Sequence, residues 1–447
     1  MNIAIAGGGR VGFHLARLLS VEGHDVTIID ADPNRIEQAD YALDVRTVNG
    51  SAVSVLLLKE IGIASADLFV AATGADELNL IAAATAKGLG AKQTVARVDD
   101  PTYIESSILY ETILSIDYLL SPEALTALEI AKFVENPGIL AAEDFGRGRV
   151  QMRQIRADRT PTTNGKTLRH ITAAGGGVLL GAISRRGESF IPHGDTVVEP
   201  GDVVTLVGRR ELLPDFQALF QNTVSETQSV VIMGGGAIGL HLAQLLDNRD
   251  RSVKLLDWNR ARCNVLAARL KRVRVVCGDA TARSTLDQEH VDKADLFVAT
   301  TDDDEHNIMA GVLAEEVGAA HTVAVVHQPD FAPLVARLGI DHAVTPRACL
   351  ANRILRLVHQ REVTTLAVLQ EGQVEVLEFD VKRANAITGR RLSEINDRIP
   401  ANALVATILR GDDVIVPGGD DVIEVGDSVV MIAALDSIEA VQRLFTR

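Results

Sequence analysis

Two glycine-rich segments constrain the fold of this chain more than any other feature: GGGRVG at residues 7–12 and GGGAIG at residues 234–239. Each segment follows an apolar stretch with strand character and opens a stretch whose apolar residues recur at helical spacing. An aspartate stands eighteen residues after the last glycine of each segment, at Asp30 and Asp257. A strand, a glycine turn, a helix and a later acidic residue, in this order, are typical of a dinucleotide-binding βαβ unit. The sequence therefore predicts two such pockets in one chain.

The residue types of the first segment fit the binding of a pyrophosphate. Gly7 permits a tight strand-to-helix turn, Gly9 lets the backbone approach the ligand, and Gly12 allows close packing of helix and strand. The phosphates then rest on free N–H groups at the positive end of the helix, without help from a side chain. Asp30 is placed to accept hydrogen bonds from ribose hydroxyls, and its charge repels the 2′-phosphate of NADP. We therefore expect NAD(H), ATP or ADP as ligands.

A duplication extends from the glycine segments over the whole chain. Gly7 and Gly234 lie 227 positions apart, and Asn79 and Asn307 lie 228 positions apart. Offsets of 224 and 225 relate positions nearer the ends of the two halves, as small loop insertions produce. Each half is thus expected to carry the same domains in the same order.

Alternating apolar strands and helices fill residues 2–117 and 229–341, which predicts an α/β fold with a doubly wound parallel sheet of Rossmann type in each half. A helix that begins with a proline follows at 122–134 and at 346–358. Short alternating runs behind these helices predict a small α+β module in each half. The polar run 222–228 is the expected linker between the halves. We place four domains at residues 1–137, 138–224, 228–360 and 363–447.

The composition describes a globular protein and argues against several classes of partner. Hydrophobic residues make up 47% of the 447 residues, which supports several cores. Lys and Arg number 44 against 60 Asp and Glu, so the net charge of −16 opposes a general affinity for nucleic acid or anionic lipid. No apolar run approaches the length that spans a bilayer, and the first strand begins at once, without a signal peptide. We therefore expect no direct membrane insertion, and a cytoplasmic protein that meets the membrane through a partner.

No signature of catalysis is evident, and we expect no enzyme activity. A nicotinamide dehydrogenase needs a second domain that orients a substrate and supplies an acid or base near the hydride. This chain carries another Rossmann-type domain instead. His14 and His241 lie within the first helix of each half, where packing or an interface explains them better than catalysis. The three cysteines lack the spacing of a disulfide framework or a zinc site, so we expect no metal and a reducing compartment.

Polar residues stand where ligands of open α/β sheets bind, beyond the carboxyl ends of the strands. Ser51 and Asp279 follow the third strand of each half, where they face the adenosine side of a ligand or simply end a turn. Thr73 and Asn79 follow the fourth strand and are expected to face the same crevice, as is Thr301 in the second half.

Charged residues nearby have two interpretations each. The acidic segments 76–77 and 303–305 precede a helix, where they cap it or hold a cation near the phosphates. Arg35 and Arg262 lie five residues after the aspartates, where they stack on adenine or lie exposed on a helix. Trp258 is the only tryptophan and could cover an adenine ring.

These features, taken together and in order, resemble the TrkA family, the cytoplasmic peripheral subunits of bacterial Trk potassium uptake systems, which are built from tandem RCK domains. The resemblance covers essentially the whole chain. It is carried by Gly7-Gly8-Gly9-Arg10-Val11-Gly12, by Ile28-Ile29-Asp30, by Ala72-Thr73 with Asp76, Glu77 and Asn79, by Ala96-Arg97-Val98, and by Gly165-Lys166-Thr167-Leu168 and Pro200-Gly201-Asp202.

This resemblance implies a homo-oligomeric ring, which we expect to be a tetramer, at the inner face of the plasma membrane beneath a membrane-embedded potassium-translocating subunit of Trk type. NAD(H) or adenine nucleotides in the crevices would change the shape of the ring and gate the pore. The family carries an arginine at the place of Arg97, which reaches ligand phosphate. Val325 takes that place in the second half, so the second pocket prefers a less charged ligand, binds more weakly or serves mainly in assembly.

Two other functions remain compatible with these residues: a nucleotide-sensing regulator of a different cation transporter, and a soluble NAD-dependent oxidoreductase with an unrecognised active site. Co-purification with a potassium channel would separate the first from a Trk regulator, and turnover of NADH would favour the second. The residues that we predict to contact the cofactor are Gly7, Gly8, Gly9, Arg10, Val11, Gly12, Asp30, Arg35, Ser51, Thr73, Asn79 and Arg97 in the first half and Gly234, Gly235, Gly236, Ala237, Ile238, Gly239, Asp257, Asp279 and Thr301 in the second.

Overall fold

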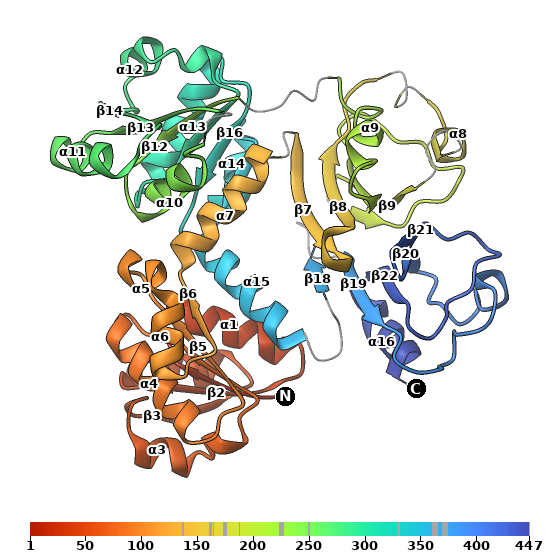
Figure 1. Cartoon of the computed structure of the whole chain (residues 1–447), viewed down its shortest axis with the longest axis horizontal. Helices are drawn as coiled ribbons and strands as arrows, with labels where there is room; N and C mark the ends of the chain where they lie inside the picture. Colours follow the sequence, from red (N-terminus) through yellow and green to blue (C-terminus); the bar gives the residue numbers. More distant parts are fainter. Residues whose placement is uncertain are drawn as a thin grey trace. The chain divides into compact units, whose positions relative to one another are not determined.

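The computed structural model divides the chain into two compact units (Figure 1). Unit 1 comprises residues 1–131 and 228–355, and unit 2 comprises residues 132–227 and 356–447. Residues 223–227 of the predicted linker lie outside the described residues. The structure describes residues 1–135, 138–160, 163, 165–172, 177–186, 188–222, 228–248, 251–328, 331–359, 365–368 and 374–446.

The first half of unit 1 is a doubly wound α/β domain, as predicted. Its six strands are parallel, in the order β3-β2-β1-β4-β5-β6. The strands are β1 (Asn2–Ala6), β2 (Asp25–Asp30), β3 (Arg46–Asn49), β4 (Leu68–Ala71), β5 (Gln93–Arg97) and β6 (Tyr118–Leu120). The helices are α1 (Arg10–Val21), α2 (Pro33–Ala42), α3 (Val55–Glu60), α4 (Asp76–Gly88), α5 (Pro101–Glu105), α6 (Ser107–Leu114) and α7 (Pro122–Glu135).

The second half of unit 1 repeats this topology. Its parallel strands lie in the order β14-β13-β12-β15-β16-β17. The strands are β12 (Ser229–Met233), β13 (Ser252–Asp257), β14 (Arg274–Cys277), β15 (Leu296–Ala299), β16 (Thr322–Val325) and β17 (His342–Val344). The helices are α10 (Ala237–Leu245), α11 (Arg260–Arg269), α12 (Arg283–Gln288), α13 (Asp304–Val317), α14 (Ala332–Arg337) and α15 (Pro346–His359).

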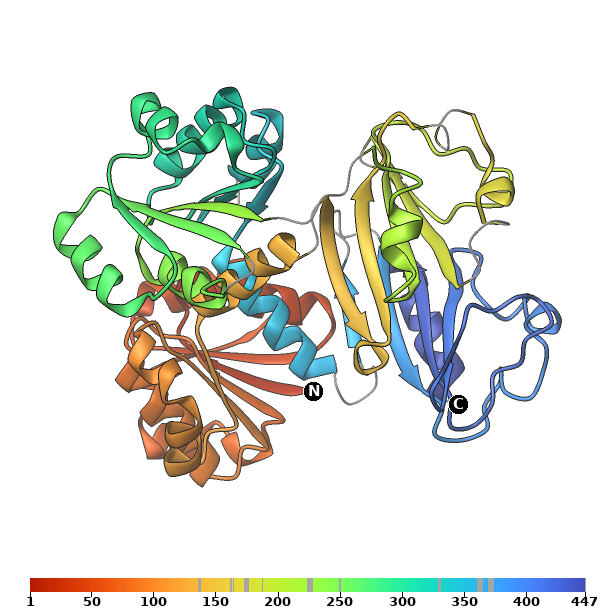
Figure 2. The ribbon, with the colours of Figure 1, turned by 45° about the horizontal axis from the view of Figure 1, so that its top comes forward.

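The central strands are apolar along their whole length because helices cover both faces of each sheet. All four residues of β4 and of β15 are buried. Figure 2 shows the strands of the first half running side by side between their helices. The strand order reverses between β1 and β4, and between β12 and β15, so a crevice opens there at the carboxyl ends of the strands.

The crossover helices α7 and α15 begin at the prolines that the sequence indicates. Proline suits the first helical position because its missing N–H has no partner there in any helix. The buried positions of α7 include Ala127 and Ile130, whereas Leu128 keeps 49% of its surface exposed. Leu350, Ile354 and Leu357 of α15 are buried.

Unit 2 holds two antiparallel sheets, with strand orders β10-β9-β11-β8-β7 and β18-β19-β22-β20-β21, so the α+β expectation is confirmed. One hydrophobic core contains residues of both sheets, among them Val150 and Val207 from the first and Val376 and Ile432 from the second. The first module contains β7 (Ile139–Phe145), β8 (Val150–Arg156), α8 (Leu168–Thr172), β9 (Val178–Arg185), β10 (Glu188–Phe190), β11 (Val203–Arg209) and α9 (Leu213–Gln217). The second contains β18 (Thr365–Val368), β19 (Val374–Asp380), β20 (Ala403–Arg410), β21 (Asp413–Ile415), β22 (Ser428–Ala434) and α16 (Ile438–Thr446).

Candidate functional site

The first glycine turn needs glycine at both of its ends. Gly7 has a φ of +108°, and a Cβ atom there would lie 2.7 Å from the carbonyl oxygen of Ala72. A Cβ atom on Gly12 would lie 1.9 Å from the carbonyl oxygen of Gly7. The turn after β12 repeats this geometry, because a Cβ atom on Gly239 would lie 1.9 Å from the carbonyl oxygen of Gly234. These glycines therefore shape the turn, whatever it binds.

The middle glycine is open to the outside. The nearest atom to a Cβ atom on Gly9 would be Nη1 of Arg35, at 3.8 Å, and nothing lies within 4 Å of the same position on Gly236. Gly9 is also the N-cap of α1, and no side chain caps this helix. The first amides of α1 thus have no helical acceptor and no capping side chain. Such an end accommodates a phosphate group.

Asp30 supports the glycine turn by accepting hydrogen bonds from backbone amides. Its Oδ2 atom accepts a hydrogen bond from the amide of Gly8 at 2.6 Å, and its Oδ1 atom accepts one from the amide of Asp32 at 2.8 Å. In the second half, Asp257 accepts from the amides of Gly235 at 2.8 Å and Asn259 at 2.7 Å. The structure therefore corrects one expectation. The amides of Gly8 and Gly235 are not free to bind a phosphate, because each already donates a hydrogen bond to the aspartate of its half.

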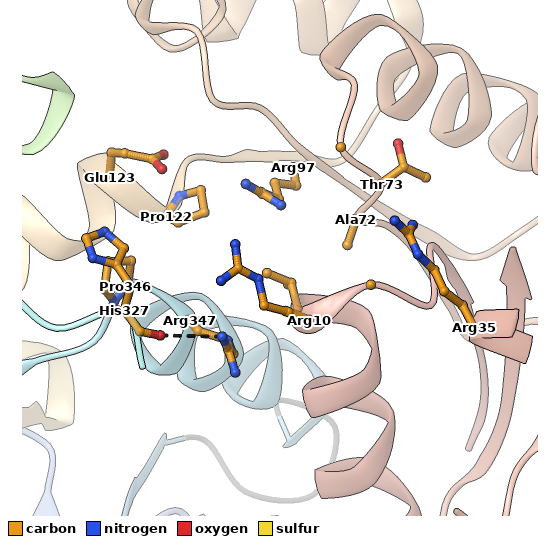
Figure 3. Close-up of a pocket in the computed structure, with 13 residues that line it drawn as sticks. Arg10, Arg35, Ala72, Thr73, Arg97, Pro122, Glu123, His327, Pro346 and Arg347 are labelled. Carbon is orange, nitrogen blue, oxygen red and sulfur yellow. Dashed lines mark hydrogen bonds between the residues drawn. The ribbon is translucent and has the colours of Figure 1, made fainter. Parts of the chain in front are cut away.

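A cavity of about 320 Å³ opens above the first turn (Figure 3). Six of the predicted contact residues line it: Gly9, Arg10, Val11, Arg35, Thr73 and Arg97. The remaining lining residues are Ala72, Gly74, Pro122 and Glu123 from the first half and His327, Pro346 and Arg347 from the second half of unit 1. The sequence gives no local signal for these last three, because they reach the cavity only when the two halves pack together.

Arg97 lies at the end of β5 and is held by an acidic neighbour. Its Nε and Nη2 atoms donate to the two carboxylate oxygens of Asp99, at 2.9 and 2.7 Å. The side chain keeps 20% of its surface exposed, toward the cavity. An arginine placed by a bidentate ion pair is oriented in advance for a further anion.

In the acidic pair after the fourth strand, Asp76 does not fill the capping role, one of the two roles predicted for the pair. Its carboxylate instead accepts hydrogen bonds from the amides of Asp99 at 3.0 Å and Asp100 at 2.8 Å. Asp76 thereby fixes the loop that carries Asp99, the ion-pair partner of Arg97. In the second half, two adjacent aspartates divide helix capping and support of the loop after the fifth strand between them. Asp303 caps α13 through the amide of His306, and Asp304 accepts from the amide of His327.

Asn79 was expected to face the crevice, but the structure places it inside the domain. The side chain is completely buried. Its Oδ1 atom accepts from the amide and the hydroxyl of Thr73 at 2.8 and 2.7 Å, and its Nδ2 atom donates to the carbonyl of Arg97 at 2.9 Å. Asn79 therefore joins the ends of β4 and β5. Ser51 is exposed and does not line the cavity.

Burial and charge act on the ionisable groups of this region. Burial raises the pKa of Glu123, which lines the cavity. Burial and then the positive charge of Arg10 lower the pKa of Arg347. Burial lowers the pKa of His14, and the charges of Arg17 and Arg347 lower it further. The two side-chain charges that act on His14 are thus both positive.

The second half has a larger cavity of about 630 Å³, and most of the charged side chains that line it are acidic. Of the residues predicted to contact a cofactor, Gly234, Gly236, Asp257, Asp279 and Thr301 line it, whereas Gly235, Ala237, Ile238 and Gly239 do not. Its other lining residues include Trp258, Arg262, Asp302, Asp303 and His306. Four carboxylates thus face one guanidinium, which itself pairs with Asp257 at 3.0 Å. Val325 is completely buried and does not line this cavity.

Among the residues that the structure describes, no group of three or more His, Cys, Asp and Glu side chains is arranged to hold a metal ion. None of the helices described is both long enough and apolar enough to span a bilayer. Cys263 and Cys277 form no disulfide.

Two domain families match this chain, each of them twice. Residues 3–122 and 230–346 match the TrkA-N domain, and residues 155–221 and 376–446 match the TrkA-C domain. The chain belongs to the TrkA family. A Trk system potassium uptake protein TrkA homolog from Archaeoglobus fulgidus is 34% identical over 446 residues, which cover all of both chains. The resemblance inferred from the motifs is thereby confirmed.

Solved structures support the same fold. The GsuK channel is 21% identical, and the alignment covers 100% of this chain and 79% of that chain with a TM-score of 0.63. The structure of the GsuK channel bound to NAD gives 20% identity, 99% and 78% coverage and a TM-score of 0.61. This chain therefore shares the overall fold of the matched parts of these structures.

Proposed function

We propose that this chain is the nucleotide-binding regulatory subunit of a Trk-type potassium uptake system. The observation that carries this proposal is the first-half cavity, in which an uncapped helix N-terminus, an open Gly9 and four arginines meet. The relative from Archaeoglobus fulgidus is named for potassium uptake and matches this chain from end to end. The RCK fold is also that of a channel whose structure holds NAD.

In this proposal the cavity binds NAD(H), ATP or ADP. The amides at the start of α1 hold the phosphates, since no side chain caps this helix. Asp30 lies behind the turn rather than on the cavity wall, and it would accept from the ribose through lone pairs that the amides of Gly8 and Asp32 and the guanidinium of Arg35 leave available. Arg97, oriented by Asp99, donates to a phosphate oxygen.

The output of binding is a change of shape rather than a reaction. A ligand shifts a conformational equilibrium only by its unequal affinity for the two states, and a tenfold preference corresponds to about 1.4 kcal/mol per site. Identical subunits in a cytoplasmic ring, which we take to be a tetramer, would add these contributions. The ring would act on a membrane-embedded potassium-translocating subunit at the inner face of the plasma membrane.

The binding step is tested with the substitution Gly9→Asp. It places a carboxylate at the open face of the turn, where the phosphates are expected, and should abolish binding of NADH and ATP measured by calorimetry. Gly88→Asp is the matched control, because Gly88 is exposed and no atom lies within 4 Å of its added Cβ. Unchanged affinity in the Gly9→Asp variant would contradict the proposal.

The regulatory step needs the membrane partner. We expect the chain to co-purify with a potassium-translocating membrane protein, and nucleotide to alter potassium flux into vesicles that contain both. Gly9→Asp should remove the nucleotide response and leave co-purification intact. If nucleotide does not change the potassium flux of the wild-type complex, the gating role is rejected.

A further inference from the structure

Two of the three cysteines, Cys263 and Cys277, lie together beside the second cavity. Cys263 is on α11, and its thiol donates to the carbonyl oxygen of Asp257 at 3.2 Å and to that of Val276 at 3.9 Å. Cys277 is the last residue of β14, and its thiol donates to the carbonyl oxygen of Trp258 at 3.9 Å. A hydrogen bond also joins the two thiols. Both sulfur atoms therefore meet at the carboxyl ends of β13 and β14.

The two thiols differ in exposure. Cys263 keeps only 6% of its surface exposed, whereas Cys277 is exposed. Burial, and then the hydrogen bond to the Cys277 thiol, raise the pKa of Cys263 to about 11. A reagent from solution thus reaches Cys277 first and finds Cys263 protonated behind it. An accessible thiol in contact with a second thiol is suited to oxidation in two steps, from a sulfenic acid to a disulfide.

The fold does not require this pair of thiols. The equivalent positions of the first half hold Ile36 and Asn49. The strands pair there in the same register, with Asp30 opposite Asn49 as Asp257 is opposite Cys277. The Nδ2 atom of Asn49 donates to the carbonyl oxygen of Asp30 at 3.1 Å. An aliphatic side chain and an amide therefore meet the needs of packing and hydrogen bonding at these two positions.

The rim of the second cavity, formed here by Trp258, Gly278 and Asp279, is attached to these thiols. Gly278 and Asp279 directly follow Cys277 in the chain. The carbonyl oxygen of Trp258 accepts from the thiol of Cys277. A disulfide would remove the S–H donors and bring the two sulfur atoms to about 2.05 Å from each other. The backbone of the rim must then adjust to the new bond between α11 and β14.

We propose that Cys263 and Cys277 are an oxidation site, which a hydroperoxide converts into a disulfide that changes the rim of the second cavity. The Cys277 thiolate attacks one oxygen of hydrogen peroxide, so that an S–O bond forms and the O–O bond breaks. The departing hydroxide takes up the proton that Cys277 released and becomes water. The product of this first step is the sulfenic acid of Cys277.

The second step joins the two cysteines. The sulfur of Cys263 attacks the sulfur of the sulfenic acid, so that the S–S bond forms and the S–O bond breaks. The hydroxide leaves as water with the proton of Cys263. The two thiols lose two electrons in all, and one hydrogen peroxide is reduced to two waters. Thiol–disulfide exchange with a reductant restores the pair, as is usual for redox-sensing disulfides in a reducing compartment.

The first test exposes the reduced full-length chain to hydrogen peroxide, blocks the remaining thiols with iodoacetamide and maps the peptides by mass spectrometry. We expect a disulfide between Cys263 and Cys277, which dithiothreitol reverses. Before oxidation, iodoacetamide should modify Cys277 at least about tenfold faster than Cys263, because only Cys277 of the two is exposed. Cys349→Ser is the matched control and should form the same disulfide. If peroxide leaves both thiols open to iodoacetamide, or if either pairs with Cys349, the proposal is overturned.

The second test removes the inner thiol. In Cys263→Ser the reaction should stop at the sulfenic acid of Cys277, which dimedone labels. Labelling of the wild type should be at least about tenfold lower, because the disulfide consumes the sulfenic acid. If thermal unfolding shows the serine variant to be less stable than the wild type, Cys263→Val takes its place, since the first half holds an aliphatic residue there. Equal labelling of the wild type and the variant would overturn the role of Cys263.

Trp258 reports on the rim of the cavity, because it is the only tryptophan of the chain and 74% of its surface is exposed. Oxidation should shift its fluorescence emission in the wild type and in Cys349→Ser, and dithiothreitol should reverse the shift. Cys263→Ser should show no such reversible shift of the wild-type size. A disulfide that forms without any change in the emission would overturn the effect on the rim.

Discussion

The carboxylate of Asp30 accepts a hydrogen bond from the amide of Gly8 at 2.6 Å, so the residue assigned to the ribose also supports the glycine turn. The same pair recurs as Asp257 and Gly235, at 2.8 Å. In both halves the aspartate is almost completely buried. A substitution of this aspartate is therefore expected to change the stability of the turn as well as the affinity for ligand.

This relationship predicts that Asp30→Ala destabilises the protein even without ligand. The substitution leaves the buried amide of Gly8 without an acceptor, which costs about 1–3 kcal/mol. Asp30→Asn keeps one side-chain oxygen and should cost less. Urea denaturation followed by circular dichroism measures the difference. Asp25→Ala, at an exposed position, is the control, and equal midpoints for the Asp30 variants and this control would contradict the assigned support.

The two glycines at positions 9 and 12 should respond differently to alanine. Gly12→Ala brings a methyl group against the carbonyl of Gly7, so the backbone must move, at a cost of about 3 kcal/mol or more. Gly9→Ala meets open space and should change the unfolding free energy by less than about 1 kcal/mol. Thermal unfolding of the two variants provides the comparison. Equal midpoints would show that the turn can relax around the methyl group.

Asn79→Leu should destabilise the first half although it adds apolar volume. The substitution leaves the amide of Thr73 and the carbonyl of Arg97 without their buried partner, at a cost of about 1–3 kcal/mol for each unsatisfied group. Asn34→Leu, on the exposed start of α2, is the matched control. Hydrogen exchange at the ends of β4 and β5 should accelerate in the Asn79 variant alone, and unchanged exchange would reject this role.

The pair His321 and Asp341 should make stability depend on pH. The two side chains lie 3.5 Å apart, and the hydrogen bond to Asp341 raises the pKa of His321 above its ordinary value of 6.5. The stabilisation is fully present below the unfolded-state pKa and is lost as the pH rises through the folded-state pKa. The advantage of the wild type over His321→Gln should therefore shrink as the pH rises above the ordinary histidine pKa of 6.5. An NMR titration of His321 below its ordinary pKa would contradict this.

Local features of the chain could be predicted because they depend on neighbouring residues. β1 and β12 have the bounds that their apolar runs indicate, and α7 and α15 begin at their prolines. Gly7 has the positive φ that its place in the motif requires. The repeat of these signals was sufficient to predict two Rossmann-type sheets, each followed by an α+β module.

The sequence by itself determined the fold of each half and the glycine turns, since strand periodicity, helix starts and backbone freedom are properties of short segments. Only the tertiary structure decided which polar groups face a ligand. It buried Asn79, turned Asp76 toward the loop after β5 and brought Arg347 to the cavity of Arg10. The physical reason is that such contacts join residues far apart in the chain, and their formation depends on how complete domains pack.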